Sequence, residues 1–245
     1  MEISLQDIYK NLLRIRDWSL VTKASVCHSV IITSASYSPW GDDVEFLSVY
    51  DIIRGNTLVD LYRCYELWSL VRQMASVEGD ILEIGVWRGG SGCLMAKRAQ
   101  AVAPSKKVFL CDTFEGVVKA SEHDTKYIGG EHSDTSVDTV LGLAGKAGVN
   151  NIEVLKGMFP EKTAHLIADR KFCLCHIDVD VYESARDIAN WVWPRISVGG
   201  CLIFDDYGFP TCDGIRRYVD ETFPRTGSLF IHNLNGHAVI IKMRD

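Results

Sequence analysis

The stretch ILEIGVWRGGSG, at residues 81–92, decides the fold. It begins with the apolar and β-branched residues of a buried strand and then turns through glycines at positions 85, 89 and 90. Glycine lets the backbone turn sharply and approach a ligand closely. Ser91 follows as a candidate helix N-cap. A strand, a glycine-rich turn and a helix in this order predict a nucleotide-type binding loop in an α/β domain.

Short apolar runs alternate with helical segments on the C-terminal side of this loop. The strands are expected at residues 81–86, 108–112, 152–157, 172–180 and 201–206. The helices between and after them are expected at residues 91–102, 134–147, 160–168, 182–195 and 213–223. This alternation predicts a mostly parallel sheet covered by helices on both faces. Two strand-like runs joined at Asn235-Gly236 predict a final hairpin with an antiparallel last strand.

The N-terminal third has a different character. Apolar residues recur at helical spacing in residues 1–78, with a polar loop near 34–41 and a helix near 58–77. We therefore divide the chain into a helical N-terminal region, residues 1–78, and a main domain, residues 79–245. The aromatic residues of the N-terminal region are expected to pack against the core or a second subunit: Tyr37, Trp40, Phe46 and Tyr50.

Composition excludes several classes of protein. The net charge is −6 and no run of lysine and arginine forms a basic face, which argues against a nucleic-acid partner. No segment has the roughly 18–20 consecutive apolar residues that a membrane span needs, and the charged N-terminus is unlike a signal peptide. The eight cysteines are scattered, with no spacing typical of a zinc site. We expect a soluble, cytoplasmic protein whose cysteines are mostly buried free thiols.

The glycine-rich turn favours one cofactor class. Its pattern is E-x-G-x-x-x-G, starting at Glu83, and not the G-x-G-x-x-G of dinucleotide enzymes. S-adenosylmethionine has no pyrophosphate to cradle, so this variant suits it. Asp112 ends the next strand, where a carboxylate can accept hydrogen bonds from ribose hydroxyls. A nicotinamide dinucleotide is the competing interpretation.

Four carboxylates stand at the ends of two later strands. HIDVDVYES places Asp178 and Asp180 at the first end, with side chains on the same side if the chain stays extended, and GGCLIFDDYG places Asp205 and Asp206 at the second. Ligands of open α/β sheets bind at these carboxyl ends, where adjacent strands are about 5 Å apart. Four such charges repel one another unless a hard cation such as Mg²⁺ neutralises them. The alternative is that the aspartates cap the helices that follow.

Several blocks of the sequence, in the same order, resemble the macrocin O-methyltransferase family (TylF/MycF type). These blocks run from about Thr57 to Glu221 and read ILEIGVWRGGS, CDTFEG, EHSDTS, LKGMFPEKT, HIDVDVYES and GGCLIFDDYGFPTCDGIRRYVDE. The resemblance implies a class I methyltransferase fold of the Rossmann-like type, with a helical N-terminal lid. It further implies a Mg²⁺-dependent sugar O-methyltransferase of the kind found in macrolide and aminocoumarin biosynthesis.

The resemblance also implies a role for individual residues. The metal ligands would be Asp178, Asp205 and Asp206, and Asp180 would be the catalytic base. With Glu83 from the turn pattern, the residues expected at S-adenosylmethionine are Thr57, Glu83, Gly85, Trp87, Arg88, Gly89, Ser91, Asp112, Thr113, Gly157 and Met158. His132, in the EHSDTS block, is favoured as a surface-loop residue.

The sequence thus predicts an S-adenosylmethionine-dependent, Mg²⁺-dependent O-methyltransferase. Its acceptor is expected to be a small molecule such as a glycosylated natural product, methylated on a hydroxyl of a vicinal diol. A homodimer or larger homo-oligomer is expected as well. Two alternatives stay open at this point: a catechol-like or other small acceptor, and a metal-dependent oxidoreductase or lyase on a nucleotide-binding fold.

Overall fold

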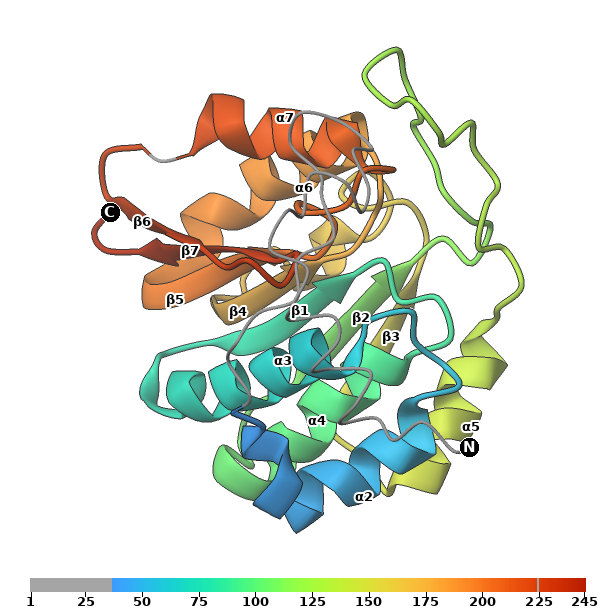
Figure 1. The fold of residues 1–245 in the computed structure, drawn as a ribbon, viewed down its shortest axis with the longest axis vertical. Coiled ribbons are helices and arrows are strands. Elements are labelled where there is room, and N and C mark those ends of the chain that lie inside the picture. Colours follow the sequence, from blue (N-terminus) through green and yellow to red (C-terminus); the bar gives the residue numbers. More distant parts are fainter. Residues whose placement is uncertain (1–36, 224) are drawn as a thin grey trace, which may run out of the picture. The chain divides into compact units, whose positions relative to one another are not determined.

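The computed structural model describes residues 37–223 and 225–245, and Asp43–Asp245 form one compact unit. Within these described residues, seven strands form one sheet in the order β3-β2-β1-β4-β5-β7-β6 (Figure 1). The strands are β1 (Asp80–Ile84), β2 (Val108–Asp112), β3 (Ile152–Lys156), β4 (Phe172–Ile177), β5 (Ile196–Phe204), β6 (Ser228–His232) and β7 (Ala238–Lys242).

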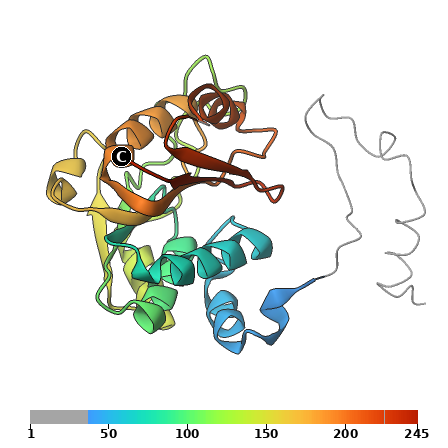
Figure 2. The same ribbon diagram turned by 90° about the vertical axis from the view of Figure 1, so that its left-hand side faces the viewer.

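The sheet has the predicted mixture of directions. Strands β1 to β5 pair in parallel, with β1 between β2 and β4. β7 pairs antiparallel with both β5 and β6, so the C-terminal hairpin completes the sheet (Figure 2). The α/β class and the antiparallel final strand predicted from the sequence are therefore confirmed.

Helices cover both faces of this sheet. On one side α6 and α7 pack together, and on the other α3 and α4 pack together, with α2 and α5 against α4 (Figure 1). The helices are α2 (Val44–Ile53), α3 (Leu61–Gln73), α4 (Gly90–Val102), α5 (Val137–Ala147), α6 (Tyr182–Val192) and α7 (Asp213–Thr222). Short 3-10 helices are η2 (Pro39–Asp42), η3 (Met74–Ser76), η4 (Ala164–Ile167) and η5 (Trp193–Arg195).

The side chains of β1 and β4 alternate between the two faces of the sheet. Leu82 and Ile84 of β1 belong to the core under α6 and α7, as do Cys175 and Ile177 of β4. The residues between them point to the opposite face, toward α3 and α4. This face carries Glu83, which pairs with His176 in the β1–β4 ladder and is completely buried.

Several element boundaries differ from the sequence prediction, and three of these differences bear on the site or its surroundings. The strand expected at 172–180 ends at Ile177, because Asp180 has a φ of +66°, which is not an extended conformation. The helix expected at 160–168 is limited to the 3-10 turn η4. Ser91 is not the N-cap of α4, because the helix already begins at Gly90 and Gly89, with a φ of +86°, holds the cap position.

The N-terminal prediction concerns residues 1–78, of which 1–36 lie outside the described part of the chain. In the remainder, α2 and α3 belong to the same compact unit as the sheet. Phe46 packs edge-on against Tyr65 and Trp68, with ring centroids 4.9 and 5.8 Å apart, and it is fully buried. The role of the N-terminal region as a lid stays a prediction.

Two further expectations concern composition. All seven cysteines that the structure describes are free and buried, which confirms that prediction for them. No helix in residues 37–223 or 225–245 is long and apolar enough to cross a membrane.

Candidate active site

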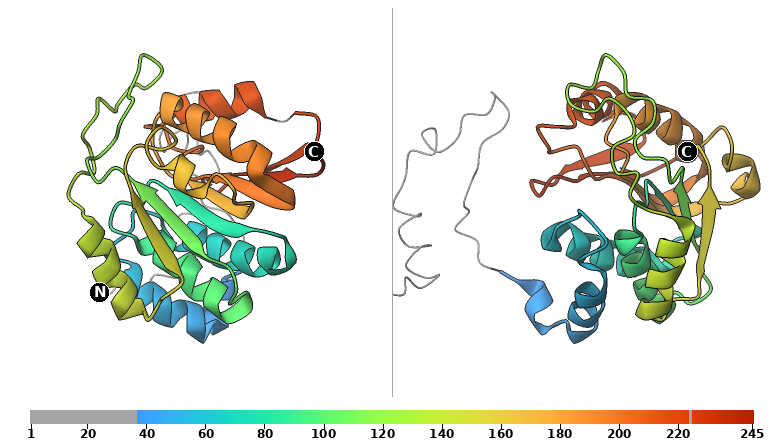
Figure 3. Two further views of the ribbon diagram at one scale, coloured as in Figure 1. Left: turned by 180° about the vertical axis from the view of Figure 1, so that it is seen from behind. Right: turned by 90° about the vertical axis from the view of Figure 1, so that its right-hand side faces the viewer.

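A cavity of about 260 Å³ opens at the carboxyl ends of β1, β2, β4 and β5. Most of the predicted site residues line it: Thr57, Gly85, Trp87, Ser91, Asp112, Thr113, Gly157, Asp178, Asp180, Asp205 and Asp206. The segment 113–136, between β2 and α5, is a long loop (Figure 3). Its residues Tyr127 and His132 line the cavity. His132, favoured as a surface residue by the sequence, is half-buried at this cavity.

Four residues predicted for the cofactor do not line this cavity. Glu83 is buried beneath it, and Arg88 instead pairs with Asp134 across 2.5 Å. Gly89 packs against α5, where an added Cβ would lie 2.9 Å from a methyl group of Val140. Met158 lines a neighbouring pocket together with Gly157.

The glycine turn is held from two sides. Gly85 has a φ of +86°, and a Cβ built on it would lie 1.7 Å from the carbonyl oxygen of Asp178. Asp112 accepts hydrogen bonds from the backbone N–H groups of Val86, Trp87 and Phe114 at 2.6, 2.9 and 2.6 Å. A carboxylate has about four lone-pair positions, so this residue can fix the turn and still accept one bond from a ligand.

The predicted carboxylate cluster forms. Single oxygens of Asp178, Asp205 and Asp206 lie within 4.8 Å of one another. Burial and the neighbouring carboxylates raise the pKa of Asp178 and of Asp206 well above the usual range. Two charges 4 Å apart repel by about 4 kcal/mol at an effective dielectric constant of 20, which favours binding of a counter-ion.

Helix capping does not explain these aspartates. The N-cap of α6 is Val181 and that of α7 is Cys212, and neither makes a side-chain cap hydrogen bond. The first N–H of α6, from Tyr182, is bound instead by Asp124 at 3.0 Å. Neither cap position is therefore filled by one of these carboxylates, which instead line the cavity, as the metal interpretation requires.

Asp180 occupies a strained and tightly held position. Its φ of +66° is uncommon for a residue with a side chain. Its N–H donates to Asp206 at 3.0 Å, its carboxylate accepts from the Cys212 thiol at 3.8 Å, and the Tyr127 hydroxyl donates to it as well. Burial raises the pKa of Asp180 above its ordinary value, although the bond from Tyr127 opposes the shift. Backbone strain of this kind is concentrated at functional sites.

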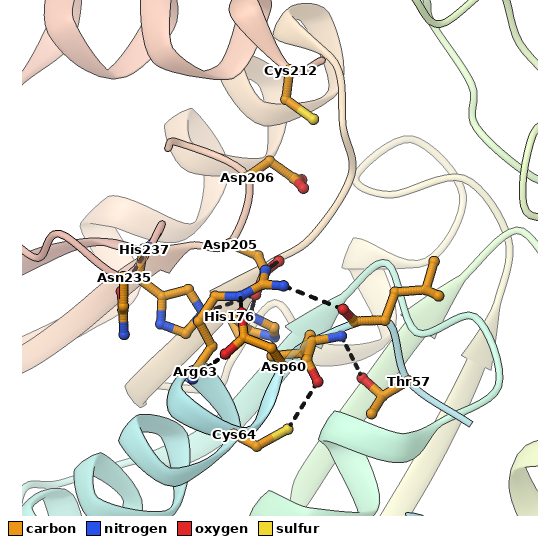
Figure 4. Close-up of polar contacts among 12 residues, drawn as sticks. Thr57, Asp60, Arg63, Cys64, His176, Asp205, Asp206, Cys212, Asn235 and His237 are labelled. Atoms are coloured by element: carbon orange, nitrogen blue, oxygen red, sulfur yellow. Dashed lines mark hydrogen bonds and ion pairs between the residues drawn. The ribbon is translucent and has the colours of Figure 1, made fainter. Parts of the chain in front are cut away.

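Asp205 is surrounded by donors (Figure 4). His237 and His176 direct their Nε2 atoms at its Oδ1, at 2.8 and 3.3 Å, and Arg63 pairs with its Oδ2. Burial alone would raise the pKa of this carboxyl, but the hydrogen bonds and nearby positive charges lower it below its usual range. Burial likewise opposes protonation of His176, yet its bonds to Asp205 and Glu83 raise its pKa to about 10.

This network corrects the sequence assignment of Glu83. Its Oε1 lies 3.0 Å from Nδ1 of His176, and its Oε2 is buried with no partner among the described residues. The side chain is therefore anchored behind Asp205 and does not face the cofactor cavity. Glycine is required opposite it, because a Cβ at Gly92 would lie 2.5 Å from Oε2.

Sequence reasoning missed the residues around Asp205. His176 precedes Asp178 by two positions and so shares its face of the strand, a signal that was present in HIDVD. Arg63 and His237 come from α3 and from the hairpin, 142 and 32 residues away from Asp205 in the chain. No local pattern links such distant segments.

The donor set fits a hard divalent cation. Its three carboxylates are of the type that Mg²⁺ prefers, and burial together with the neighbouring carboxylates raises the pKa of Asp178 and of Asp206, as expected where a cation is needed to keep both charged. Asp205 is paired with Arg63 and two histidines and stays ionised. It can therefore bind a cation without first losing a proton.

Several known proteins are similar to this chain in sequence. The family described as macrocin-O-methyltransferase (TylF) matches residues 51–225. The mycinamicin III 3''-O-methyltransferase of Micromonospora griseorubida is 27% identical over 234 residues, which cover 88% of this chain and 89% of that protein. The 8-demethyl-8-(2,3-dimethoxy-alpha-L-rhamnosyl)-tetracenomycin-C 4'-O-methyltransferase of Streptomyces olivaceus is 31% identical over 176 residues, covering 66% of this chain and 67% of that protein.

The fold is shared with solved methyltransferase structures. The O-methyltransferase NovP superposes with a TM-score of 0.64 at 24% identity, covering 77% of this chain and 83% of that one. The family match spans the glycine-rich turn and the cavity residues Asp178, Asp180, Asp205 and Asp206. The chain therefore belongs to the macrocin-O-methyltransferase (TylF) family and is an S-adenosylmethionine-dependent O-methyltransferase.

Proposed function

We propose that this enzyme methylates one hydroxyl of a vicinal diol on the sugar part of a glycosylated natural product, and that it requires Mg²⁺. One observation carries the proposal: Asp178, Asp205 and Asp206 meet in the cavity that also contains the glycine turn. The relative from Streptomyces olivaceus supports a sugar acceptor, because its name specifies a rhamnosyl compound.

Within this proposal, Asp178, Asp205 and Asp206 hold the metal ion. A bound divalent cation would supply Lewis-acid activation of the acceptor hydroxyl. Asp180 accepts the hydroxyl proton, and its raised pKa brings it closer to the working range of a general base. The Tyr127 hydroxyl and the Cys212 thiol keep its carboxylate in place.

The cofactor occupies the other part of the cavity. The turn at Gly85 and Trp87, with Ser91, would hold the methionine end, and Asp112 with Thr113 would hold the ribose, since all of them line the cavity. Bound S-adenosylmethionine would supply the methyl group for the acceptor oxygen, with the carbon–sulfur bond electrons retained by S-adenosylhomocysteine as the leaving group. The chain contributes by holding both reactants in line, which converts an encounter in solution into a reaction within one complex.

The acceptor class can be tested with simple glycosides. Release of S-adenosylhomocysteine is measured with methyl α-L-rhamnoside, with its 2-deoxy and 3-deoxy analogues, and with catechol. We expect the diol to react and the 3-deoxy analogue, which retains neither the 2,3- nor the 3,4-diol, to lose roughly 10²-fold or more in kcat/KM, because a polar site is then left unfilled. The 2-deoxy analogue retains the 3,4-diol and so distinguishes the two pairs. Preference for catechol would contradict the sugar assignment and leave the methyltransferase assignment intact.

Metal removal gives a separate prediction. Dialysis against EDTA is expected to abolish turnover, and Mg²⁺ in excess of the chelator is expected to restore it. Isothermal titration should show that affinity for S-adenosylmethionine is unchanged, because Asp112, which holds the glycine-rich turn through the N–H of Val86, is not one of the three proposed metal ligands. The control is enzyme treated with EDTA already saturated with Mg²⁺. Full activity in the metal-free enzyme would refute the metal requirement.

Location and assembly complete the proposal. The free state of the seven described cysteines supports a reducing, cytoplasmic compartment. The homo-oligomer expected from the sequence stays a prediction, which light scattering during size-exclusion chromatography would check.

A further inference from the structure

Two buried histidines, His176 and His237, lie behind Asp205. His176 and His237 have no exposed surface and do not line the cavity, so neither can contact cofactor or acceptor directly. Both rings nevertheless direct Nε2 at the same oxygen of a cavity carboxylate. Burying two imidazoles together is costly unless each nitrogen finds a partner, so their placement calls for an explanation.

Each ring is fixed at its other nitrogen. Nδ1 of His176 lies 3.0 Å from Glu83, and Nδ1 of His237 lies 2.6 Å from Glu66. A ring whose two nitrogens both face carboxylates cannot rotate without breaking a bond. Glu66 also accepts from Asn235 at 2.9 Å and from Asn233, and these bonds attach the hairpin loop before β7 to α3.

The third donor comes from the same helix. Arg63 pairs with Oδ2 of Asp205, and its Nε donates to Asp60, the N-cap of α3, at 2.9 Å. Its guanidinium stacks over the ring of Phe209, 4.5 Å from the centroid. Asp205 is therefore held by groups from β4, from α3 and from the residue preceding β7 (Figure 4).

The number of donors limits how Asp205 can bind a cation. In the described part of the chain, three side chains donate to its carboxylate, which has about four lone-pair positions. One position is left, so the carboxylate can serve as a ligand through one lone pair only. The Nε2–Oδ1 distance of 2.8 Å is that of a hydrogen bond, with no room for a second ion between ring and carboxylate.

We propose that His176 and His237, anchored by Glu83 and Glu66, form a histidine clamp that sets the orientation of Asp205 for single-point metal binding. The clamp rests on the proposed function, because it presupposes a cation at the three aspartates. The two histidines are positioning residues and not catalytic ones. Groups that orient a metal ligand typically change metal affinity by 10- to 100-fold when they are removed.

The test separates two variants of one residue. In His237→Gln the side-chain amide can occupy the Nε2 position and still donate to Asp205, whereas the shorter amide of His237→Asn reaches only the Nδ1 position near Glu66. Mn²⁺, a hard ion with similar ligand preferences, is titrated into the full-length protein and followed by electron paramagnetic resonance. S-adenosylmethionine affinity and the thermal midpoint are measured in parallel, with the exposed His165→Asn as control.

We expect the Kd for Mn²⁺ to rise about 10- to 100-fold in His237→Asn and by less than about threefold in His237→Gln, with S-adenosylmethionine affinity unchanged in both. A role in stability alone would lower the thermal midpoint but leave Mn²⁺ affinity equal in both variants, which overturns the clamp. Absence of Mn²⁺ binding by the unmodified protein overturns the proposed metal site and the clamp with it.

A second measurement needs no variant. With ¹⁵N-histidine labelling, the buried N–H groups of the clamp should give slowly exchanging imidazole signals that shift when Mg²⁺ is added. Signals that stay unchanged at saturating Mg²⁺ would overturn the proposal even if His237→Asn fails to fold.

Discussion

Replacing Asp180 with asparagine is expected to lower kcat by about 10²- to 10⁴-fold, the contribution typical of a positioned general base. The amide keeps the size of the side chain but cannot accept the hydroxyl proton. The proposed metal ligands are Asp178, Asp205 and Asp206. Asp180 is not among them, so the change removes a base without removing a metal ligand.

Binding measurements decide how this result is interpreted. Affinity for S-adenosylmethionine is expected to stay within about twofold of the unmodified enzyme, since Asp180 contacts Asp206, Cys212 and Tyr127 and none of the groups that hold the glycine turn. The matched control is Asp169→Asn, because Asp169 is 86% exposed and does not line the cavity. If Asp180→Asn retained a near-normal kcat, Asp180 would not be the group that accepts the hydroxyl proton.

The second large effect is expected for Gly85→Ala. A methyl group at this position would lie 1.7 Å from the carbonyl oxygen of Asp178, a backbone atom that side-chain rotation cannot move. The φ of +86° is in addition unfavourable for alanine. We expect a loss of roughly 3 kcal/mol or more in the free energy of unfolding, from backbone strain and the displacement of strand ends together.

The same substitution should affect ligand binding. The contact joins the end of β1 to the residue that follows β4, so relief of the clash must move either the glycine turn or Asp178. We expect weaker binding of both S-adenosylmethionine and Mn²⁺ in the folded fraction, measured by calorimetry, with stability from urea denaturation. Gly142→Ala in α5 is the matched control: nothing lies within 4 Å of its added methyl group, and alanine is the better helix former. Equal stability of Gly85→Ala and Gly142→Ala would contradict the strain argument.

The sequence predicted those cavity-lining residues that directly follow an apolar, strand-like run. Gly85, Asp112 and the aspartate pairs each end an apolar run, and a parallel sheet gathers such ends at one edge. Glu83 was misassigned because its place in the E-x-G-x-x-x-G pattern does not reveal which face of β1 it occupies. Side chains of a strand alternate between the two faces of the sheet, and only the packed helices show which face is which. The side chain of Glu83 lies on the face covered by α4, beside Gly92.

Asp180 illustrates a different limit. The alternating pattern of HIDVD predicts an extended strand through this residue, but the strand ends at Ile177 and Asp180 has a positive φ. The hydrogen bond of its N–H to Asp206 and the contact of its carboxylate with Cys212 come from the segment after β5. A local pattern contains no information about these distant contacts, which act together to hold the strained backbone.

What the sequence by itself determined was the α/β class, the succession of strands and helices along the chain and the gathering of carboxylates at one sheet edge, because periodicity and glycine placement are local properties of the chain. Only the tertiary structure decided that Arg63, His176 and His237 meet at Asp205. These groups come from α3, β4 and the C-terminal hairpin, and their convergence depends on how helices and strands pack, a property that no single segment of the sequence contains.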